Sequence, residues 1–392
     1  MRFREFTDSW TLIPIKKLLR FQNGINADST KYGKGIKYIS VSDILNNQYI
    51  TYDCIKGLID IDEKTLNKFI VEYGDILFQR SSETFEDIGR ANVYLDKEHS
   101  ATFGGFVIRG KKISDYNPLF FRYLLCTHNA RKQTVRMGAG AQHYNIGQEG
   151  LEKICLYFPG LQEQQKISDL LSAIDNKIAV QNKIISKYET LIKGLTDCLL
   201  NKKEDNYYTF KDLYLKAGEG GTPTTDNNSY YENGTIPFIK IDDLSQKYIK
   251  RNSDYITHLG LEKSAAWLIP TNSVIFSNGA TIGRISINTY PIATKQGVLG
   301  IVPSSIVMAE YLYYYMKTTY FRRQVRRITV KGTMDCAYLK DLNSIICHIP
   351  DINHQEKRIA LLTVLDEKIA CERMILQKLK EQKKYLLSKM FI

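Results

Sequence analysis

The chain has 392 residues, which exceeds the usual size of one domain and predicts two or three domains, each with its own core. It carries 54 Lys and Arg against 42 Asp and Glu, a formal net charge of +12. Such an excess suits a polyanionic partner, because each neutralised phosphate releases counterions, although a high pI alone also occurs in proteins without such a partner.

Local sequence argues against membrane, zinc-binding and disulfide-rich classes. No uninterrupted apolar run approaches the roughly 20 residues that a membrane span needs, and the N-terminus has no apolar signal region. The seven cysteines are scattered and never form a C-x-x-C pair, which gives no zinc framework and fits a reducing compartment. We therefore expect a cytosolic protein that does not bind membranes.

Residues 1–158 alternate short β-like runs with polar loops, which is typical of an α+β domain. The clearest runs are 37–41, 75–78 and 106–108. Amide side chains match adenine edges and basic side chains match guanine edges, so polar loop residues are candidates for reading DNA bases. In this segment the candidates are Gln79, Arg80 and Gln142. Each of them also fits an ordinary loop residue that faces water.

Residues 159–205 form the first long helical segment, which begins just after Pro159. Its apolar positions alternate at spacings of four and three residues, the pattern of a coiled-coil seam. From 162 to 200 there are 39 residues, about 58 Å at 1.5 Å each, which is longer than a compact domain requires. The alternative is an amphipathic helix packed on its own domain. The predicted seam includes Ile167, Leu171, Ile174, Ile178, Gln181 and Ile185.

Residues 206–349 form a second α+β segment, with β-like runs at 236–241, 273–276 and 284–287. The turn Gly220–Pro223 lacks both of the glycine spacings that cradle nucleotide phosphates. Candidate base-reading side chains here are Lys240, Asn278, Lys295 and Gln296.

The strongest indication of DNA binding is a basic helix predicted over 309–328. A charge run is often only a solvated helix face, but basic residues recur 191 positions earlier in the first segment. We therefore predict contacts with the phosphate backbone, which position a protein on DNA without specifying sequence. The predicted contacts are Arg322, Arg323, Arg326 and Arg327, with Arg131, Lys132 and Arg136 at matching positions of the first segment.

Residues 350–392 repeat the first helical segment at the same offset. Between 159–179 and 350–370, 9 of 21 positions are identical without a gap, so the chain contains an internal duplication. The equivalent seam includes Leu362, Leu365, Ile369, Glu372 and Leu376. We expect the two helices to pair with each other as an antiparallel coiled coil.

No catalytic motif accompanies this architecture. The six histidines show neither H-x-x-x-H nor H-x-x-E-H spacing, and no G-x-S-x-G elbow exists. We expect no metal site and no catalytic residue in this chain.

The chain resembles the specificity subunits of type I restriction-modification systems. The resemblance lies in Gly220–Leu244, which is similar to the opening of a target recognition domain, and in 159–179 and 350–370, which are similar to the two helical regions of that family. It covers essentially the whole chain in the order domain, helix, domain, helix. The first segment departs from it, because Phe21–Asp28 stands where the Gly-Gly-Thr-Pro turn is expected.

The resemblance implies a fold of class α+β with a pseudo-two-fold repeat: a target recognition domain at 1–158, a helical spacer at 159–205, a second recognition domain at 206–349 and a second spacer at 350–392. Each domain would read half of a bipartite double-stranded DNA site. A spacer of about 58 Å corresponds to about 17 base pairs, so the half-sites are expected roughly one to one and a half turns apart.

The same resemblance implies partners that carry the chemistry. Two modification subunits would bind the helices and supply S-adenosylmethionine for adenine methylation, and restriction subunits using ATP and Mg²⁺ would join through them. This chain itself is expected to bind no cofactor. Two alternatives remain: the DNA-recognition subunit of a methylation-only complex, and a coiled-coil scaffold whose basic charge is incidental.

Overall fold

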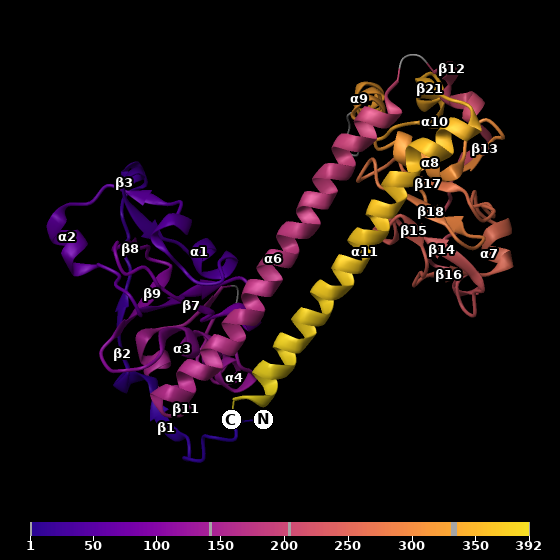
Figure 1. Ribbon diagram of the computed structural model, residues 1–392. Coiled ribbons are helices and arrows are strands. Elements are labelled where there is room, and N and C mark those ends of the chain that lie inside the picture. Colours follow the sequence, from indigo (N-terminus) through magenta and orange to yellow (C-terminus); the bar gives the residue numbers. More distant parts are fainter. Residues whose placement is uncertain (1, 141–142, 203–204, 331–334, 392) are drawn as a thin grey trace. The chain divides into compact units, whose positions relative to one another are not determined.

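The computed structural model describes residues 2–140, 143–202, 205–330 and 335–391. The chain divides into two compact units, each of which is described here by itself. Unit 1 comprises Met1–Asn182 and Met374–Ile392, and unit 2 comprises Lys183–Arg373. Two long helices, α6 (Leu161–Leu200) and α11 (Ile352–Lys389), each contribute residues to both units (Figure 1).

Domain 1 denotes the residues of unit 1 that precede α6. Its strands are β1 (Thr11–Pro14), β2 (Leu19–Asn23), β3 (Tyr32–Ile39), β4 (Leu58–Ile59), β5 (Ile76–Gln79), β6 (Ser81–Ser82), β7 (Ala91–Val93), β8 (Thr102–Phe103), β9 (Val107–Lys112), β10 (Tyr144–Asn145) and β11 (Cys155–Phe158). Its helices are α1 (Val41–Asn46), α2 (Glu63–Lys68), α3 (Pro118–Leu125), α4 (His128–Arg136) and α5 (Gln148–Glu152).

Domain 2 denotes the residues of unit 2 between α6 and α11. Its strands are β12 (Asn206–Thr209), β13 (Tyr214–Glu219), β14 (Ile236–Ile239), β15 (Tyr248–Ile249), β16 (Tyr255–Ile256), β17 (Val274–Ser277), β18 (Ile285–Asn288), β19 (Ala293–Thr294), β20 (Val298–Pro303) and β21 (Ile346–Ile349). Its helices are α7 (His258–Glu262), α8 (Ala309–Tyr315), α9 (Thr319–Ile328) and α10 (Leu339–Leu342).

The two domains share one sheet topology. The order β2-β9-β5-β7 in domain 1 corresponds to β13-β20-β17-β18 in domain 2, where β15 adds a fifth strand. A second sheet, β4-β3-β8, corresponds to β16-β14-β19, and in both the central strand pairs antiparallel on one side and parallel on the other. Every residue of β5 and β17 is buried, as expected for a central strand covered on both faces.

The prediction of one continuous helix over 309–328 is wrong, because the structure has two helices there, α8 and α9. Thr318 adopts an extended conformation, and its hydroxyl accepts a hydrogen bond from the Phe321 amide at 3.2 Å. That arrangement is an N-cap, which starts a new helix. The domain 1 counterpart is Thr127, which separates α3 from α4 in the same way.

Each long helix is anchored to the domain that precedes it by the same two side chains. In unit 1 the Tyr123 hydroxyl donates to the Asp175 carboxylate at 2.8 Å, and in unit 2 Tyr314 donates to Asp366 at 2.6 Å. The second anchor is a buried glutamine near the start of each helix. Its side-chain oxygen accepts a hydrogen bond from a backbone amide of the domain. The Asn117 amide donates to Gln164, and the Met308 amide donates to Gln355, both at 2.9 Å. All four helix positions are related by the offset of 191.

Within each unit, α6 and α11 lie side by side and antiparallel. In unit 1, Lys383 of α11 pairs with Asp175 of α6 at 2.6 Å. Val180, which lies later in α6, lines a groove together with Ile375 and Leu379, which lie earlier in α11. In unit 2, Arg373 pairs with Glu189 at 2.6 Å, while Leu200 shares a core with the still earlier Leu362.

The predicted seam positions all face inward. Ile178, Leu365 and Leu376 are half-buried, and the others are buried: Ile167, Leu171, Ile174, Gln181, Ile185, Leu362, Ile369 and Glu372. No helix in the described part of the chain combines the length and apolar character needed to cross a membrane.

Removing the Tyr314 hydroxyl tests the helix anchor. The variant Tyr314→Phe leaves the Asp366 carboxylate without this donor and removes one acceptor of Lys247, whose ammonium lies 3.1 Å from the Tyr314 hydroxyl. We expect a loss of about 1.5–3 kcal/mol in the free energy of unfolding, as for hydrogen bonds to charged groups. Urea unfolding measures it. Tyr320→Phe is the matched control, since its hydroxyl bonds only a more exposed carbonyl, that of Ile346. An equal loss in both variants contradicts the anchoring role.

Lys317 makes the stability of unit 2 depend on pH. Its ammonium donates to the Tyr313 hydroxyl at 2.6 Å, and burial lowers its pKa from 10.5 to about 8. Between these two values the unfolded chain binds more protons than the folded one, so this group's contribution to stability rises with pH across that window. We expect the stability of the wild type relative to Lys317→Met to increase from pH 7.5 to pH 9.5 in urea titrations. A difference that is constant with pH argues against a lowered pKa.

Candidate nucleic-acid interface

Two predicted base-reading residues of domain 2 lie next to each other at one edge of its smaller sheet. Strands β14 and β19 are parallel and end at Ile239 and Thr294, so the residues that follow, Lys240 and Lys295, leave the sheet at the same edge. The Lys295 amide donates to the Ile239 carbonyl at 2.9 Å, which fixes the two backbones together. We call the residues around this point, including Asn278 and Gln296, the loop edge of domain 2.

Asp254 holds both ammonium groups at this edge. The Lys295 ammonium lies 2.8 Å from one Asp254 oxygen, and the Lys240 ammonium lies 3.3 Å from the other. The hydrogen bond from Lys295 is the largest cause that lowers the pKa of Asp254 to about 2, so this carboxylate stays ionised at neutral pH. All three side chains are about one-third exposed and accessible to a ligand.

The two other predicted base-reading residues of domain 2 differ in how far their side chains are exposed to solvent. Asn278 is fully buried, and its side chain donates to the Ala337 carbonyl at 3.4 Å, so it ties loops together inside the domain. Gln296 is exposed, and its side chain projects at the loop edge, while its backbone amide lies 3.5 Å from the Thr222 hydroxyl. Arg284, which sequence reasoning did not single out, also lies here, with its guanidinium 3.1 Å from Asp242.

The equivalent loop edge of domain 1 carries different side chains. Gln79 is 5% exposed because it ends the buried strand β5, and its amide donates to the Ser81 carbonyl. Arg80 is half-buried and lies 3.3 Å from the Gly105 carbonyl. Phe106, next to it, is 68% exposed and was missed, since a lone aromatic residue carries no motif. Gln142 lies outside the described residues.

The predicted backbone-binding arginines of domain 2 form an exposed surface on α9. Phe321 and Val325 turn inward, which leaves the other face of the helix to Arg322, Arg323, Arg326 and Arg327, all exposed. The tyrosines on α8 that accompanied them in the sequence are buried in the core instead: Tyr311, Tyr313, Tyr314 and Tyr315.

The matching residues of domain 1 divide into two kinds. Lys132 and Arg136 are exposed on α4. Arg131 is half-buried, and its guanidinium donates to the carbonyls of Glu86 and Ile88 at 2.8 and 2.7 Å. Burial lowers the pKa of Arg131. Arg131 and Arg322 therefore occupy equivalent positions in the repeat, but Arg131 is half-buried whereas Arg322 is exposed.

In each domain the basic helix continues directly into the loop edge. After α4 the chain forms an antiparallel bridge between Ala139 and Asn145, and the Ile146 amide then donates to the Arg80 carbonyl at 3.0 Å. After α9 the corresponding bridge joins Val330 and Cys336, and the Ala337 amide donates to the Asn278 carbonyl at 2.9 Å. One connection thus places a positive helix end beside the candidate reading side chains in both domains.

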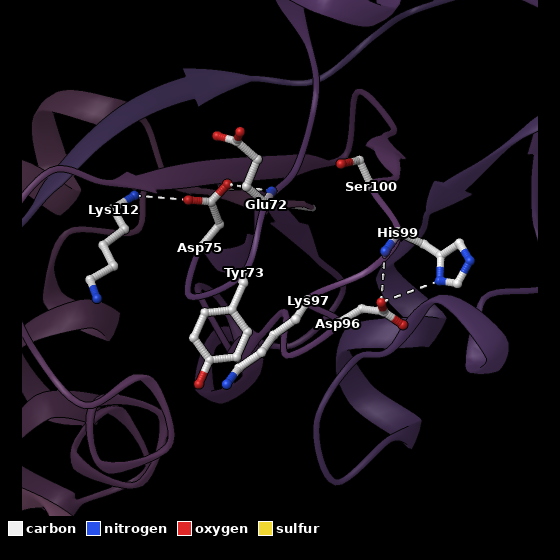
Figure 2. Close-up of a pocket in the computed structure, with 8 residues that line it drawn as sticks. All are labelled: Glu72, Tyr73, Asp75, Asp96, Lys97, His99, Ser100 and Lys112. Carbon is white, nitrogen blue, oxygen red and sulfur yellow. Dashed lines mark hydrogen bonds and ion pairs between the residues drawn. The ribbon is translucent and has the colours of Figure 1, made fainter.

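A pocket of about 400 Å³ in domain 1 lies at the other end of the strands (Figure 2). Glu72, Asp75 and Lys112 are among the residues that line it. The loop edge adjoins Gln79 and Val107, at the opposite ends of β5 and β9. Its central carboxylate, Asp75, already pairs with the Arg109 guanidinium at 2.7 Å. In the described part of the chain no group of three or more His, Cys, Asp or Glu side chains is arranged to hold a metal ion.

Comparisons with known proteins point to one family. The model of the type I restriction modification DNA specificity domain matches residues 9–190 and 203–381. A putative type I restriction enzyme MjaX specificity subunit of Methanocaldococcus jannaschii is 22% identical over 409 residues, which cover 98% of this chain and 93% of the relative. The type I restriction enzyme HindI specificity subunit of Haemophilus influenzae is 30% identical over 380 residues, with 76% and 80% covered.

The fold matches a solved structure over its full length. The S subunit of the type I restriction-modification system from M. genitalium superposes with a TM-score of 0.58 at 14% identity, covering 100% of this chain and 99% of that one. At this identity the match reports the fold alone.

Replacing Arg131 and Lys132 one at a time tests whether Arg131 stabilises the fold while the exposed Lys132 does not. Arg131→Gln removes the donor to two carbonyls, and we expect a loss of about 1–3 kcal/mol in the free energy of unfolding. Lys132→Gln, at an exposed position, is the matched control and is expected to change it by less than about 0.5 kcal/mol. Thermal and urea unfolding measure both, and equal stability of the two variants contradicts the assignment.

Proposed function

The chain belongs to the type I restriction-modification DNA specificity family, and from this premise we propose that it selects the DNA sequence on which its partner subunits act. One observation supports this role above the others: two copies of one domain each place a basic helix beside a loop edge of polar side chains. Phosphate contacts would orient each domain, and the loop edge would read bases.

The target is bipartite in this proposal. Each domain reads one half-site, and the two loop edges carry different side chains, so the half-sites differ in sequence. Helices α6 and α11 carry both domains through the same pair of anchors, and their length sets the gap between the half-sites.

The chemistry belongs to partner subunits. Two modification subunits bind the helices and supply S-adenosylmethionine for adenine methylation, and restriction subunits with ATP and Mg²⁺ join through them; the chain itself is not catalytic and binds no cofactor. Large apolar side chains exposed on α6 and α11 support helix faces as the docking surface: Val180, Leu191, Leu361, Val364 and Met374. The complex acts in the cytoplasm, which suits seven cysteines that are all free.

The scaffold alternative predicts no sequence preference, and the methylation-only alternative differs in partners alone. The chain, co-expressed with its modification subunits, is incubated with a randomised duplex library over a salt series. We expect enrichment of two short constant blocks around a fixed, unspecified gap. A continuous motif, or binding without preference at every salt concentration, overturns the bipartite reading. Copurification of restriction subunits excludes the methylation-only complex.

Neutralising one arginine of α9 tests the backbone contact. We expect Arg326→Gln to weaken binding to all duplexes to a similar extent and to reduce the slope of log K against log salt by about 0.9, the value for one lost phosphate contact. Lys263→Gln, which removes one exposed charge on the C-terminal side of α7, is the matched control. Titrations at four salt concentrations measure the slope. Identical slopes in the two variants contradict a phosphate contact by α9.

A further inference from the structure

The smaller sheets of the two domains share their backbone hydrogen bonds but carry different side chains at three equivalent positions. In domain 2 the Phe238 amide bonds the Asp254 carbonyl, as the Tyr38 amide bonds the Gly57 carbonyl in domain 1. The Lys295 amide bonds the Ile239 carbonyl, as the Gly104 amide bonds the Ile39 carbonyl.

The third position directly follows the central strand, where domain 2 has Lys240 and domain 1 has Ser40. One backbone frame thus carries Lys, Asp and Lys in domain 2, but Ser, Gly and Gly in domain 1.

We propose that Asp254 is a positioning residue that aims the Lys295 ammonium at a guanine in the half-site read by domain 2. This inference rests on the proposed function and adds a base and the residues that select it. Lysine donates to O6 and N7 of guanine in the major groove, and guanine is the base that offers two acceptors there.

The geometry leaves donors on Lys295 free for a ligand. An ammonium group has three hydrogens, and among the described residues the one hydrogen-bond partner of the Lys295 ammonium is Asp254, at 2.8 Å. The side chain is about one-third exposed, so the remaining donors reach solvent. Lys240 is held less tightly, 3.3 Å from Asp254 and 3.2 Å from the Ser253 hydroxyl, and closes the other side of the carboxylate.

The Asp254 carboxylate favours a base over a phosphate as the ligand. A phosphate that approaches Lys295 meets a negative charge bound to the same nitrogen, and like charges repel. A guanine edge is neutral and does not meet this repulsion. The exposed arginines of α9 have no carboxylate partner within ion-pair distance among the described residues, so they are the better phosphate ligands.

Selection of DNA by the complex with modification subunits tests the proposal, because one molecule reports both half-sites at once. We expect Asp254→Asn to reduce guanine preference at one position of one half-site by about fivefold or more, within the range for one base contact. The other half-site stays unchanged, because domain 1 lacks the three side chains. Binding to random duplex is not weakened, since the variant loses a negative charge.

Three further variants separate positioning from structure. Lys295→Met is expected to lose the same guanine preference, and Lys295→Arg to retain it, because arginine also matches guanine. Lys263→Met, an exposed lysine elsewhere in domain 2, is the control and leaves the motif intact. Melting temperatures confirm that each variant folds.

Each remaining outcome overturns the inference. A wild-type split motif that Asp254→Asn and Lys295→Met leave intact overturns the inference while the proposed function stands. If Asp254→Asn weakens binding to all duplexes equally and lowers the melting temperature, the aspartate stabilises the fold and does not position Lys295 for a base. A wild-type complex that selects no split motif overturns the proposed function together with this inference.

Discussion

The tyrosine–aspartate hydrogen bond between each long helix and its domain, buried in unit 1 and partly buried in unit 2, is the contact on which the rest of the structure depends. A carboxylate on a buried helix face is costly unless it is paired, and Asp175 and Asp366 find their donors in Tyr123 and Tyr314 of the preceding domain. The helix is therefore held in one orientation on its domain, because sliding or rotation separates the carboxylate from its tyrosine donor. Loops elsewhere in the domain are free to differ without disturbing the helix.

The duplication separates what must be retained from what can change. Strand order, the Thr N-cap and the tyrosine–aspartate anchor are the same in both units, and all of them involve the core or the helices. The loop edges share backbone hydrogen bonds, such as those of Gly104 and Lys295 to the central strand. A backbone bond does not depend on side-chain identity, so one frame accommodates Gly at one edge and Lys at the other. The proposed difference in base preference between the two domains requires no change in this backbone frame.

Local signals in the sequence were sufficient for the architecture and insufficient for the site. The 3.5-residue period depends on neighbouring positions and the offset of 191 on matching residue types along the chain, so the helices, their repetition and the basic surface of α9 were predictable from the sequence. The N-cap at Thr318 is a local hydrogen bond that divides a segment predicted as one helix, whereas the inward guanidinium of Arg131 and the burial of Gln79 depend on packing between distant segments. Asp254 was invisible for the same reason: its two lysine partners lie 14 and 41 residues away.

Ion pairing at the loop edge has a consequence for discrimination between sequences. A free lysine attracts any phosphate, which strengthens binding to all DNA equally and adds nothing to the difference between sites. With Asp254 bound to it, Lys295 loses much of that general attraction but keeps its directed hydrogen bonds. In the proposed function the exposed arginines of α9 then supply the attraction that does not depend on sequence. In this proposal specificity rises because Lys295 reads a base while the arginines of α9 bind phosphates, and the Asp254 carboxylate keeps these two roles on different cations.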